Sequence, residues 1–423
     1  MEKSSLTYQT YLQILRRELV PAMGCTEPIA VAYCAAIARR ILNKMPERVE
    51  VEASGNIIKN VKSVIVPNTD GRRGVEAAAA VGIVAGDDSR GLEVIAGVSE
   101  EDKRRLSEFL ETVPIRVVPA SSDLVLDVVV TLFSGSEEAR VRIINHHTGL
   151  ALIEKNGEIL FADEPVNPAA ESGLDYGLLS VAGIYDFAVT ADLDDVKDVL
   201  DRQIQYNCAI SKEGLSGKYG ASIGMVLLRQ GNDVHTRARA KAAAGSDARM
   251  DGCELPVVIN SGSGNQGITV CVPVVEYAEA LGCEKERLYR ALLLSNLIAV
   301  HLKEGIGRLS AYCGAVSAGA SAGAAISYLK GGNLDSISHT LVNALAISSG
   351  MVCDGAKPSC AAKIAVAVDT GLLAMEMYEA GQQFYGGDGI VLKGVENTIR
   401  NVGVLGREGM RETDKTIIDL MTR

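Results

Sequence analysis

The segment "PAMGCTEPIAVAYCAAIARR" (residues 21–40) has a cysteine at the start of an expected helix. From Pro28 onward apolar residues recur every four positions, and Thr26 is the expected N-cap. Cys25 then precedes a helix N-terminus, where the macrodipole and unpaired backbone N–H groups favour an anion. A thiolate at this position suits a base or a nucleophile. The residues alone leave open the alternative of a small packed side chain in a tight turn.

Three further cysteines lie beside residues that interrupt helices. Cys313 belongs to "LSAYCGAVSAGASAG", and Cys353 and Cys360 enclose a glycine and a proline in "MVCDGAKPSC". A close pair with a distant third cysteine provides donors for one iron–sulfur cluster. The spacing matches neither a ferredoxin run nor a zinc knuckle, so ordinary buried thiols remain the alternative. Buried thiols are also expected at the other five cysteines: Cys34, Cys208, Cys253, Cys271 and Cys283.

Two glycine-containing stretches carry side chains suited to a small polar ligand. In "VVINSGSGNQGITVCVPV" (257–274) an apolar run gives way to four candidate ligand contacts: Ser261, Ser263, Asn265 and Gln266. The stretch lacks the features of a P-loop or a dinucleotide fingerprint, which argues against nucleotide binding, and a structural turn is the alternative. In "VPNTDGRRGVEAAAA" (66–80), Asn68 and Thr69 are candidates for closing over the pocket, with a plain turn as the alternative.

The elements that must position these residues fall into two parts. Strand patterns at 48–54, at 57–67 and after residue 123, with helix patterns at 74–86 and 99–112, predict an α+β N-terminal domain (1–165). The segment from Asp163 to Gly173 is the expected linker. A mainly all-α domain (175–423) is expected to follow, with helices at 191–212, 234–246, 272–282, 284–303, 307–329, 333–349, 358–380 and 391–404.

Composition excludes several classes of protein. The chain has 423 residues with 43 glycines, five phenylalanines and no tryptophan, so its interior must be packed by small and aliphatic side chains. The net charge of −11 and the lack of a basic cluster argue against nucleic acid and anionic membranes as partners. Residues 309–329 are mostly Ala, Gly and Ser, so we expect a buried helix there and no membrane span. No signal peptide is recognised, and the expected location is cytoplasmic.

Four motifs in order, "GCTEP", "NSGSGNQGI", "SAYCGA" and "CDGAKPSC", resemble those of the L-cysteine desulfidase family. The second half of the chain is also similar to the α region of bacterial iron–sulfur L-serine dehydratases. The resemblance runs nearly end to end and implies a serine-dehydratase-like catalytic domain. It further implies a [4Fe–4S] cluster whose ligands are Cys313, Cys353 and Cys360, with one open iron.

Two departures from the dehydratases bear on the substrate. Some dehydratases end in a cysteine that occupies the open iron, whereas this chain ends "TDKTIIDLMTR". The dehydratases also have Ser-Ser-His-Thr at a helix start where this chain has Gly-Cys-Thr-Glu. The second departure favours cysteine over serine as the substrate.

The resemblance implies an α,β-elimination that depends on the cluster and not on pyridoxal phosphate. The expected reaction converts L-cysteine to pyruvate, ammonia and sulfide. Cys25 is the candidate base, the alternatives being a fourth cluster ligand or a sulfur carrier. Thr26 and Glu27 join the polar side chains of the two glycine-containing stretches as candidate contacts of the small amino-acid substrate. An L-serine dehydratase and a non-catalytic iron–sulfur binding or sensing protein are the rival interpretations, and a homodimer is left open.

Overall fold

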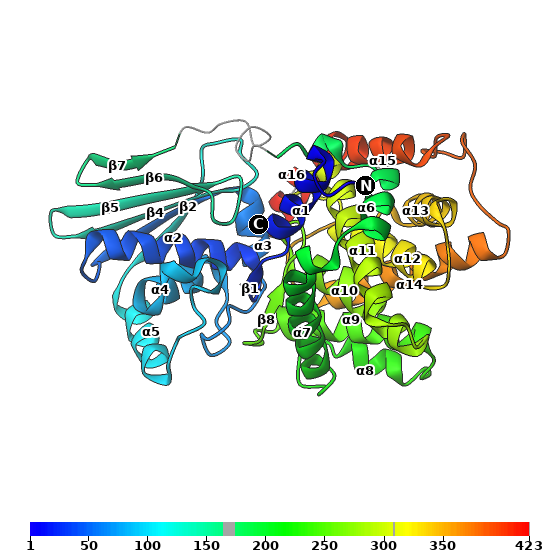
Figure 1. Ribbon diagram of the computed structural model, residues 1–423. Helices are drawn as coiled ribbons and strands as arrows, with labels where there is room; N and C mark the ends of the chain where they lie inside the picture. The colour runs from blue at the N-terminus through cyan, green and yellow to red at the C-terminus, as the bar shows by residue number, and fades with distance from the viewer. Residues whose placement is uncertain (164–173, 308, 423) are drawn as a thin grey trace.

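The structure is a computed structural model that describes residues 1–163, 174–307 and 309–422. A β-sheet flanked by helices lies beside a larger bundle of helices (Figure 1). The chain therefore has a mixed α+β fold in which helices predominate. The expected linker, and with it the expected domain boundary, falls on residues 164–173, which are outside the described residues.

The sheet has six strands in the order β3-β2-β4-β5-β6-β7. β2 and β3 are parallel, and the other neighbouring strands are antiparallel. Val49, Val51 and Ala53 of β2 are fully buried whereas Glu50 and Glu52 are partly exposed, as expected for a strand with one face on the core. The bounds are β2 (Arg48–Ala53), β3 (Ile115–Pro119), β4 (Asp127–Ser134), β5 (Glu137–Ile144), β6 (Leu150–Lys155) and β7 (Glu158–Ala162).

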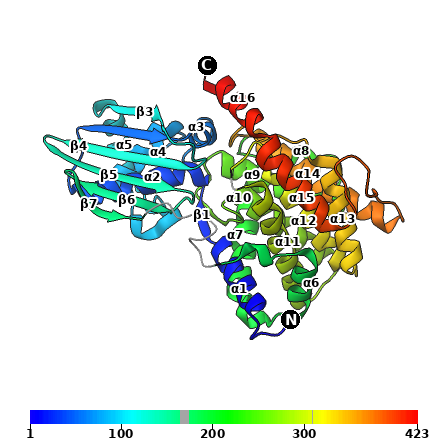
Figure 2. The same ribbon diagram turned by 90° about the horizontal axis from the view of Figure 1, so that it is seen from above.

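Helices cover one face of this sheet, with α2 packed on β4 and β5 and α4 packed on α2 (Figure 1). α5 begins with a capping box in which Ser99 and Asp102 satisfy each other's backbone N–H groups. A short helix, α3, follows β2 directly and lies at the edge that faces the bundle (Figure 2). The bounds are α2 (Thr26–Leu42), α3 (Gly55–Val61), α4 (Gly74–Ala85), η1 (Asp88–Glu93) and α5 (Glu100–Thr112).

The bundle is packed through small residues. A Cβ on Gly319 of α12 would lie 2.3 Å from the Ala367 carbonyl oxygen of α14, so only glycine permits this approach. The 3-10 and π-helical segments of this part are η2 (Tyr176–Leu178), η3 (Leu193–Asp195) and η4 (Leu405–Gly409). The α-helices are α6 (Val181–Thr190), α7 (Lys197–Gly214), α8 (Ile223–Leu228), α9 (Val234–Met250), α10 (Gly264–Ala280), α11 (Lys285–Ile306), α12 (Gly314–Leu329), α13 (Leu334–Ser348), α14 (Ser359–Glu379), α15 (Val395–Val404) and α16 (Arg411–Thr422).

The start of the chain belongs to the bundle in space. α1 (Leu6–Glu18) packs on α6 and α11, with the Tyr8 and Tyr11 rings edge-on to Phe187 at centroid distances of 5.0 and 5.6 Å. β1 (Pro21–Met23) then pairs antiparallel with β8 (Pro256–Val258). This two-stranded ribbon is where the chain crosses from the bundle to the sheet, immediately before Cys25.

Most expected elements are confirmed, and three local expectations are wrong. Residues 57–67 do not form a strand, because residues 55–61 form α3. Cys25, not Thr26, is the N-cap of α2, because Thr26 already has helical geometry and its hydroxyl bonds elsewhere. α10 begins at Gly264 rather than 272, so Asn265 and Gln266 lie in a helical first turn and not in a loop.

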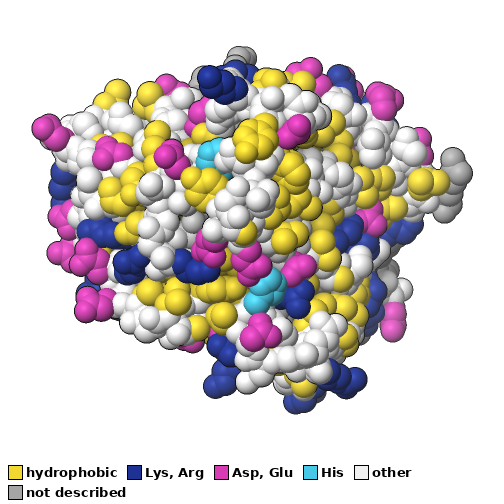
Figure 3. All heavy atoms as spheres, turned by 90° about the vertical axis from the view of Figure 1, so that its right-hand side faces the viewer, with side chains coloured by type: hydrophobic (Ala, Val, Ile, Leu, Met, Phe, Trp, Pro, Cys, Tyr) yellow, Lys and Arg dark blue, Asp and Glu magenta, His cyan; other side chains and the backbone are white. Residues whose placement is uncertain are grey.

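The surface of the bundle is mixed in character. On the face seen in Figure 3, acidic, basic and hydrophobic side chains are interspersed. Exposed hydrophobic residues of this part include Ile347, Val366 and Leu373. No helix within the described residues is long and apolar enough to cross a membrane, and residues 314–329 instead form the buried helix α12.

Candidate active site

The starts of four long helices meet at one cavity of about 110 Å³ between the sheet part and the bundle. α2 contributes Cys25 and Glu27, and α12 contributes Cys313. The first turns of α10 and α14 supply further lining residues, and α3 lines the side that belongs to the sheet part. Because each helix start carries partial positive charge and unpaired N–H groups, the cavity suits a negatively charged ligand.

The β1–β8 ribbon places the starts of α2 and α10 next to each other. α2 begins two residues after β1, and α10 begins after a tight turn that follows β8. The Thr26 hydroxyl joins them by donating to the Gly262 carbonyl at 2.9 Å. In that turn Ser263 caps α10, its hydroxyl accepting from the Gln266 backbone N–H at 3.4 Å.

Cys25 and Glu27 form a buried pair. The Cys25 thiol donates to Glu27 Oε2 at 3.0 Å, and Asn60 Nδ2 donates to Glu27 Oε1 at 3.0 Å. Burial opposes ionisation of Glu27, but His147, the Cys25 thiol and the Arg249 charge together hold its pKa well below the usual range. Burial and the Glu27 charge raise the pKa of Cys25 well above the usual range. Both directions favour a neutral thiol beside a carboxylate, against the thiolate that the helix start alone favours.

Cys313, Cys353 and Cys360 line the same cavity as Cys25. Two backbone hydrogen bonds fix the first two against each other, from Cys313 N to the Met351 carbonyl and from Cys353 N to the Ala311 carbonyl. Cys360 lies in the first turn of α14. Burial, and after it the neighbouring Cys353 thiol, raises the pKa of Cys313 to about 12. Within the described ranges no three His, Cys, Asp or Glu side chains are grouped to hold a single metal ion.

Basic side chains outnumber acidic ones around the cavity. Its described lining contains one carboxylate, Glu27, and four basic residues: Lys59, Arg249, Lys303 and Lys363. Lys59 pairs with Asp414 of α16 at 2.5 Å, and Lys363 pairs with Asp354. The Arg249 guanidinium packs flat on α10, where a Cβ on Gly264 would lie 2.2 Å from Nε. The described lining therefore offers a bound anion more basic side chains than carboxylates.

Several buried polar atoms around the cavity have no hydrogen-bond partner among the described residues. They are Asn56 Oδ1, Asn60 Oδ1, Arg249 Nε, Asn265 Oδ1 and Gln266 Oε1. Buried polar atoms are normally paired, and each unpaired one calls for an explanation. A small ligand with both acceptors and donors, such as an amino-acid zwitterion, satisfies atoms of both kinds.

The structure brings eight of the twelve predicted site residues to this cavity: Cys25, Glu27, Ser263, Asn265, Gln266, Cys313, Cys353 and Cys360. The other four lie outside its lining. Thr26 bonds to Glu27 and Gly262, and the Ser261 hydroxyl donates to Asn260 Oδ1 at 2.9 Å. Asn68 and Thr69 donate to the backbone carbonyls of Ile95 and Val66. These bonds fit the plain turn that was the alternative to a role in closing over the pocket.

Sequence reasoning missed the contribution of α3 and of the basic residues. Asn56, Lys59 and Asn60 are spaced to share one face of a helix, a signal that the strand interpretation concealed. Arg249 lies at the end of α9, where no local sequence motif identifies it as a site residue. Lys303, in the last turn of α11, is only 5% exposed.

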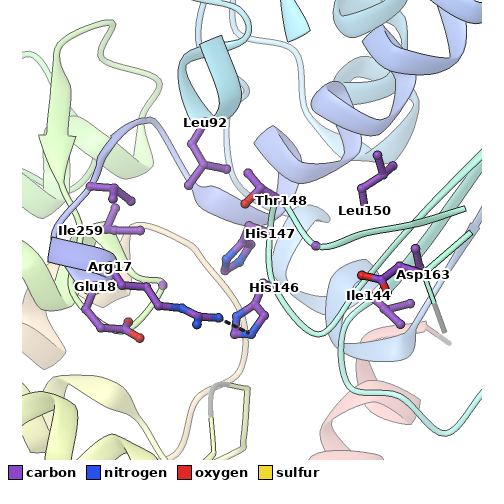
Figure 4. A pocket seen from close by; sticks show the side chains of 14 residues that line it. Arg17, Glu18, Leu92, Ile144, His146, His147, Thr148, Leu150, Asp163 and Ile259 are labelled. Atoms are coloured by element: carbon purple, nitrogen blue, oxygen red, sulfur yellow. Dashed lines mark hydrogen bonds between the residues drawn. The ribbon is translucent and has the colours of Figure 1, made fainter. Parts of the chain in front are cut away.

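A second cavity of about 350 Å³ has His147 on its lining (Figure 4), and His147 Nε2 lies 4.0 Å from Glu27 Oε1. It is lined by α1 residues, by the turn after β5 and by Gly262, whose carbonyl bonds to Thr26. Figure 4 shows His146 bonded to Arg17, at 3.3 Å, while the neighbouring His147 takes no part in that contact. Thr148 and Asp163 on its lining are exposed, so water reaches this cavity.

Comparisons with known proteins agree on one family. The family model for the serine dehydratase alpha chain matches residues 89–419. A UPF0597 protein of Desulfitobacterium hafniense is 57% identical over 422 residues, covering 100% of this chain and 98% of the relative. UPF0597 proteins of Lachnoclostridium phytofermentans and Finegoldia magna are 50% and 47% identical, each covering 98% of this chain and 99% of the relative.

Proposed function

The chain belongs to the family of the serine dehydratase alpha chain, and on that premise we propose a lyase acting on L-cysteine with a [4Fe–4S] cluster as cofactor. The proposed products are pyruvate, ammonia and sulfide. The observation that carries the proposal is the single cavity shared by three cysteines, the Cys25–Glu27 pair and the buried polar atoms that lack partners. The two domains expected from the sequence and a homodimeric assembly remain predictions.

The residues present fit the cluster. Cys313, Cys353 and Cys360 are free, part-exposed thiols on one cavity wall and would hold it. A cluster with thiolate ligands is anionic, and the surrounding helix starts and basic side chains match that charge. When bound, it supplies a Lewis acid that polarises the bond to the departing sulfur.

Binding and orientation of the amino acid fall to the polar lining. Arg249 is the residue proposed to bind the substrate carboxylate, because a guanidinium gives two parallel charge-assisted hydrogen bonds. The amide oxygens of Asn56, Asn265 and Gln266, which lack partners, accept from the substrate ammonium. When these contacts form, they hold the Cα atom of the substrate in the buried interior of the cavity and exclude water.

Removal of the α-proton falls to Cys25 and Glu27. Cys25 passes its own proton to Glu27 along their 3.0 Å hydrogen bond as it takes the proton from Cα. The low pKa of Glu27 makes this transfer uphill, so the protonated carboxyl is short-lived and must pass its proton on. The electron pair of the C–H bond forms the C=C bond of aminoacrylate, and the C–S electron pair leaves with the sulfur. Hydrolysis of aminoacrylate then gives pyruvate and ammonia.

Serine is the second candidate substrate, because the family match itself concerns serine dehydratase. The same residues would remove water instead of hydrogen sulfide. What favours cysteine is the Gly-Cys-Thr-Glu start of α2, which differs from the dehydratase motif. A non-catalytic cluster-binding protein would need neither the Cys25–Glu27 pair nor the polar atoms that lack partners.

The test is anaerobic reconstitution with iron and sulfide, followed by assays of pyruvate and ammonia with L-cysteine, L-serine and L-threonine. We expect about four irons per chain, broad absorbance near about 400 nm that air bleaches, and a clear preference for cysteine. A preference for serine selects the second candidate. Full iron loading without turnover of any amino acid supports the sensing protein, and absence of iron binding refutes all three.

A further inference from the structure

We infer that the His147 imidazole is a proton relay, which carries protons between Glu27 and water in the second cavity. The inference rests on the proposed elimination and extends it to a residue outside the first cavity. His147 comes from the turn between β5 and β6, a segment that the sequence marked only as a strand end.

The position of His147 bridges the two cavities. Its side chain lines the second cavity, yet its Nε2 lies 4.0 Å from Oε1 of Glu27, which lines the first. The residue is 7% exposed, and Nε2 has no hydrogen-bond partner in the part of the chain that the structure describes. The separation is about 1 Å longer than a hydrogen bond, a gap that catalytic contacts close when substrate binds.

The chemistry requires such a route. Each elimination moves one proton from Cα to the Cys25–Glu27 pair, and the pair must lose that proton before the next turnover. Glu27 is buried, with its oxygens held by Cys25, Thr26 and Asn60. The proton therefore leaves Glu27 by forming an N–H bond on His147, and the imidazolium then gives a proton to water. No electrons are transferred, and the imidazole is restored in each cycle.

The charges around His147 suit this role. Glu27 of α2 faces Nε2, Arg17 and Glu18 of α1 and Asp163 after β7 lie on the second cavity, and His146 is the chain neighbour. The Arg249 charge also acts on Glu27. A carboxylate close to an imidazole nitrogen can exchange a proton with it, and an imidazole can both accept and donate a proton at neutral pH.

The contact can be tested without turnover, by NMR of protein labelled with ¹⁵N in its five histidines. The His147 signal is the one that persists in single variants of the other four. Across a pH series, Glu27→Gln should shift the His147 signal, because it removes the carboxylate charge 4.0 Å from Nε2. The matched control is Glu396→Gln, because Glu396 pairs with His301 at 2.7 Å and should shift only that signal. A His147 signal that is unchanged in Glu27→Gln overturns the inference.

The relay itself is tested on the reconstituted enzyme. His147→Gln should lower kcat about 10- to 100-fold with iron content and melting temperature unchanged, while His146→Gln stays within about twofold. In His147→Ala, the space of the lost side chain is continuous with the 350 Å³ cavity. Added imidazole should therefore raise the kcat of this variant about tenfold, and more basic imidazoles should raise it further. Normal kcat in His147→Gln, or a loss that imidazole does not restore, overturns the relay.

The two tests separate this inference from the proposed function. A wild-type protein that turns over no amino acid refutes the proposed function, while the NMR titration still decides whether Glu27 and His147 are coupled. An active wild type with an unaffected His147→Gln variant refutes the relay and leaves the lyase in place.

Discussion

Replacing Cys25 by serine isolates the proposed removal of the α-proton. The serine hydroxyl still donates to Glu27 Oε2, so the buried carboxylate keeps a partner and the start of α2 is preserved. What is lost is a group that gives up its proton readily, because an alcohol is far less acidic than a thiol. We expect kcat to fall about 10²- to 10⁴-fold, equal to about 3 to 5 kcal/mol of transition-state stabilisation.

The assay measures sulfide and pyruvate formation, iron content and melting temperature on one preparation. Iron should be unchanged, and the free energy of unfolding should change by less than about 1.5 kcal/mol, the net contribution of one hydrogen bond. Cys34→Ser is the matched control, because Cys34 is buried on the same helix and its thiol donates to the Val141 carbonyl at 3.3 Å, away from the cavity. It should lower stability and leave kcat unchanged.

Each other outcome for Cys25→Ser has its own meaning. Loss of iron together with activity identifies Cys25 as a fourth cluster ligand. Full iron with turnover within a few-fold of wild type refutes the role proposed for the Cys25–Glu27 pair and leaves Cys25 as a packed side chain.

Three further predictions concern the cluster, the substrate and stability. The proposed cluster ligands are Cys313, Cys353 and Cys360, and serine at any one of them should remove most of the iron, measured by chelation. The control variant Cys283→Ser should remove none. Arg249→Gln should raise KM for cysteine about 10- to 100-fold with iron unchanged, the effect of losing a charged hydrogen bond. Burial raises the pKa of Asp247 to about 6, above the ordinary value of about 4, so its ionisation destabilises the fold as pH rises between those values. Asp247→Asn should therefore raise the free energy of unfolding by up to about 3 kcal/mol at pH 8 but little at pH 4, measured by urea unfolding.

The cysteines of the cavity were visible in the sequence because each lies within two residues of a glycine or proline. Cys313 precedes Gly314, and Cys360 follows Pro358 by two residues, so residue type and element boundary coincide. Such local signals also predicted most helices of the bundle, whose starts depend on nearby capping residues and glycines.

The sequence misled where distant segments decide local structure. Ile57 and Ile58 favour a strand, but residues 55–61 form a helix on which the C-terminal α16 packs, with Ile418 3.0 Å from the position of a Cβ on Gly55. The acid–base state of Cys25 was also missed. The helix start favours a thiolate, but burial and the charge of Glu27 oppose it more strongly.

The β1–β8 ribbon has a consequence for how the protein is made. The contact that joins the starts of α2 and α10 links residues 236 positions apart. At about 5–20 residues per second, a ribosome needs roughly 10 to 50 s to add that much chain after Thr26 emerges. During this interval Cys25 and Glu27 have no cavity to line, and all three proposed cluster ligands are synthesised later still. Cluster insertion therefore belongs to the finished chain, and a nascent chain that stalls before β8 carries a cysteine without its protecting pocket.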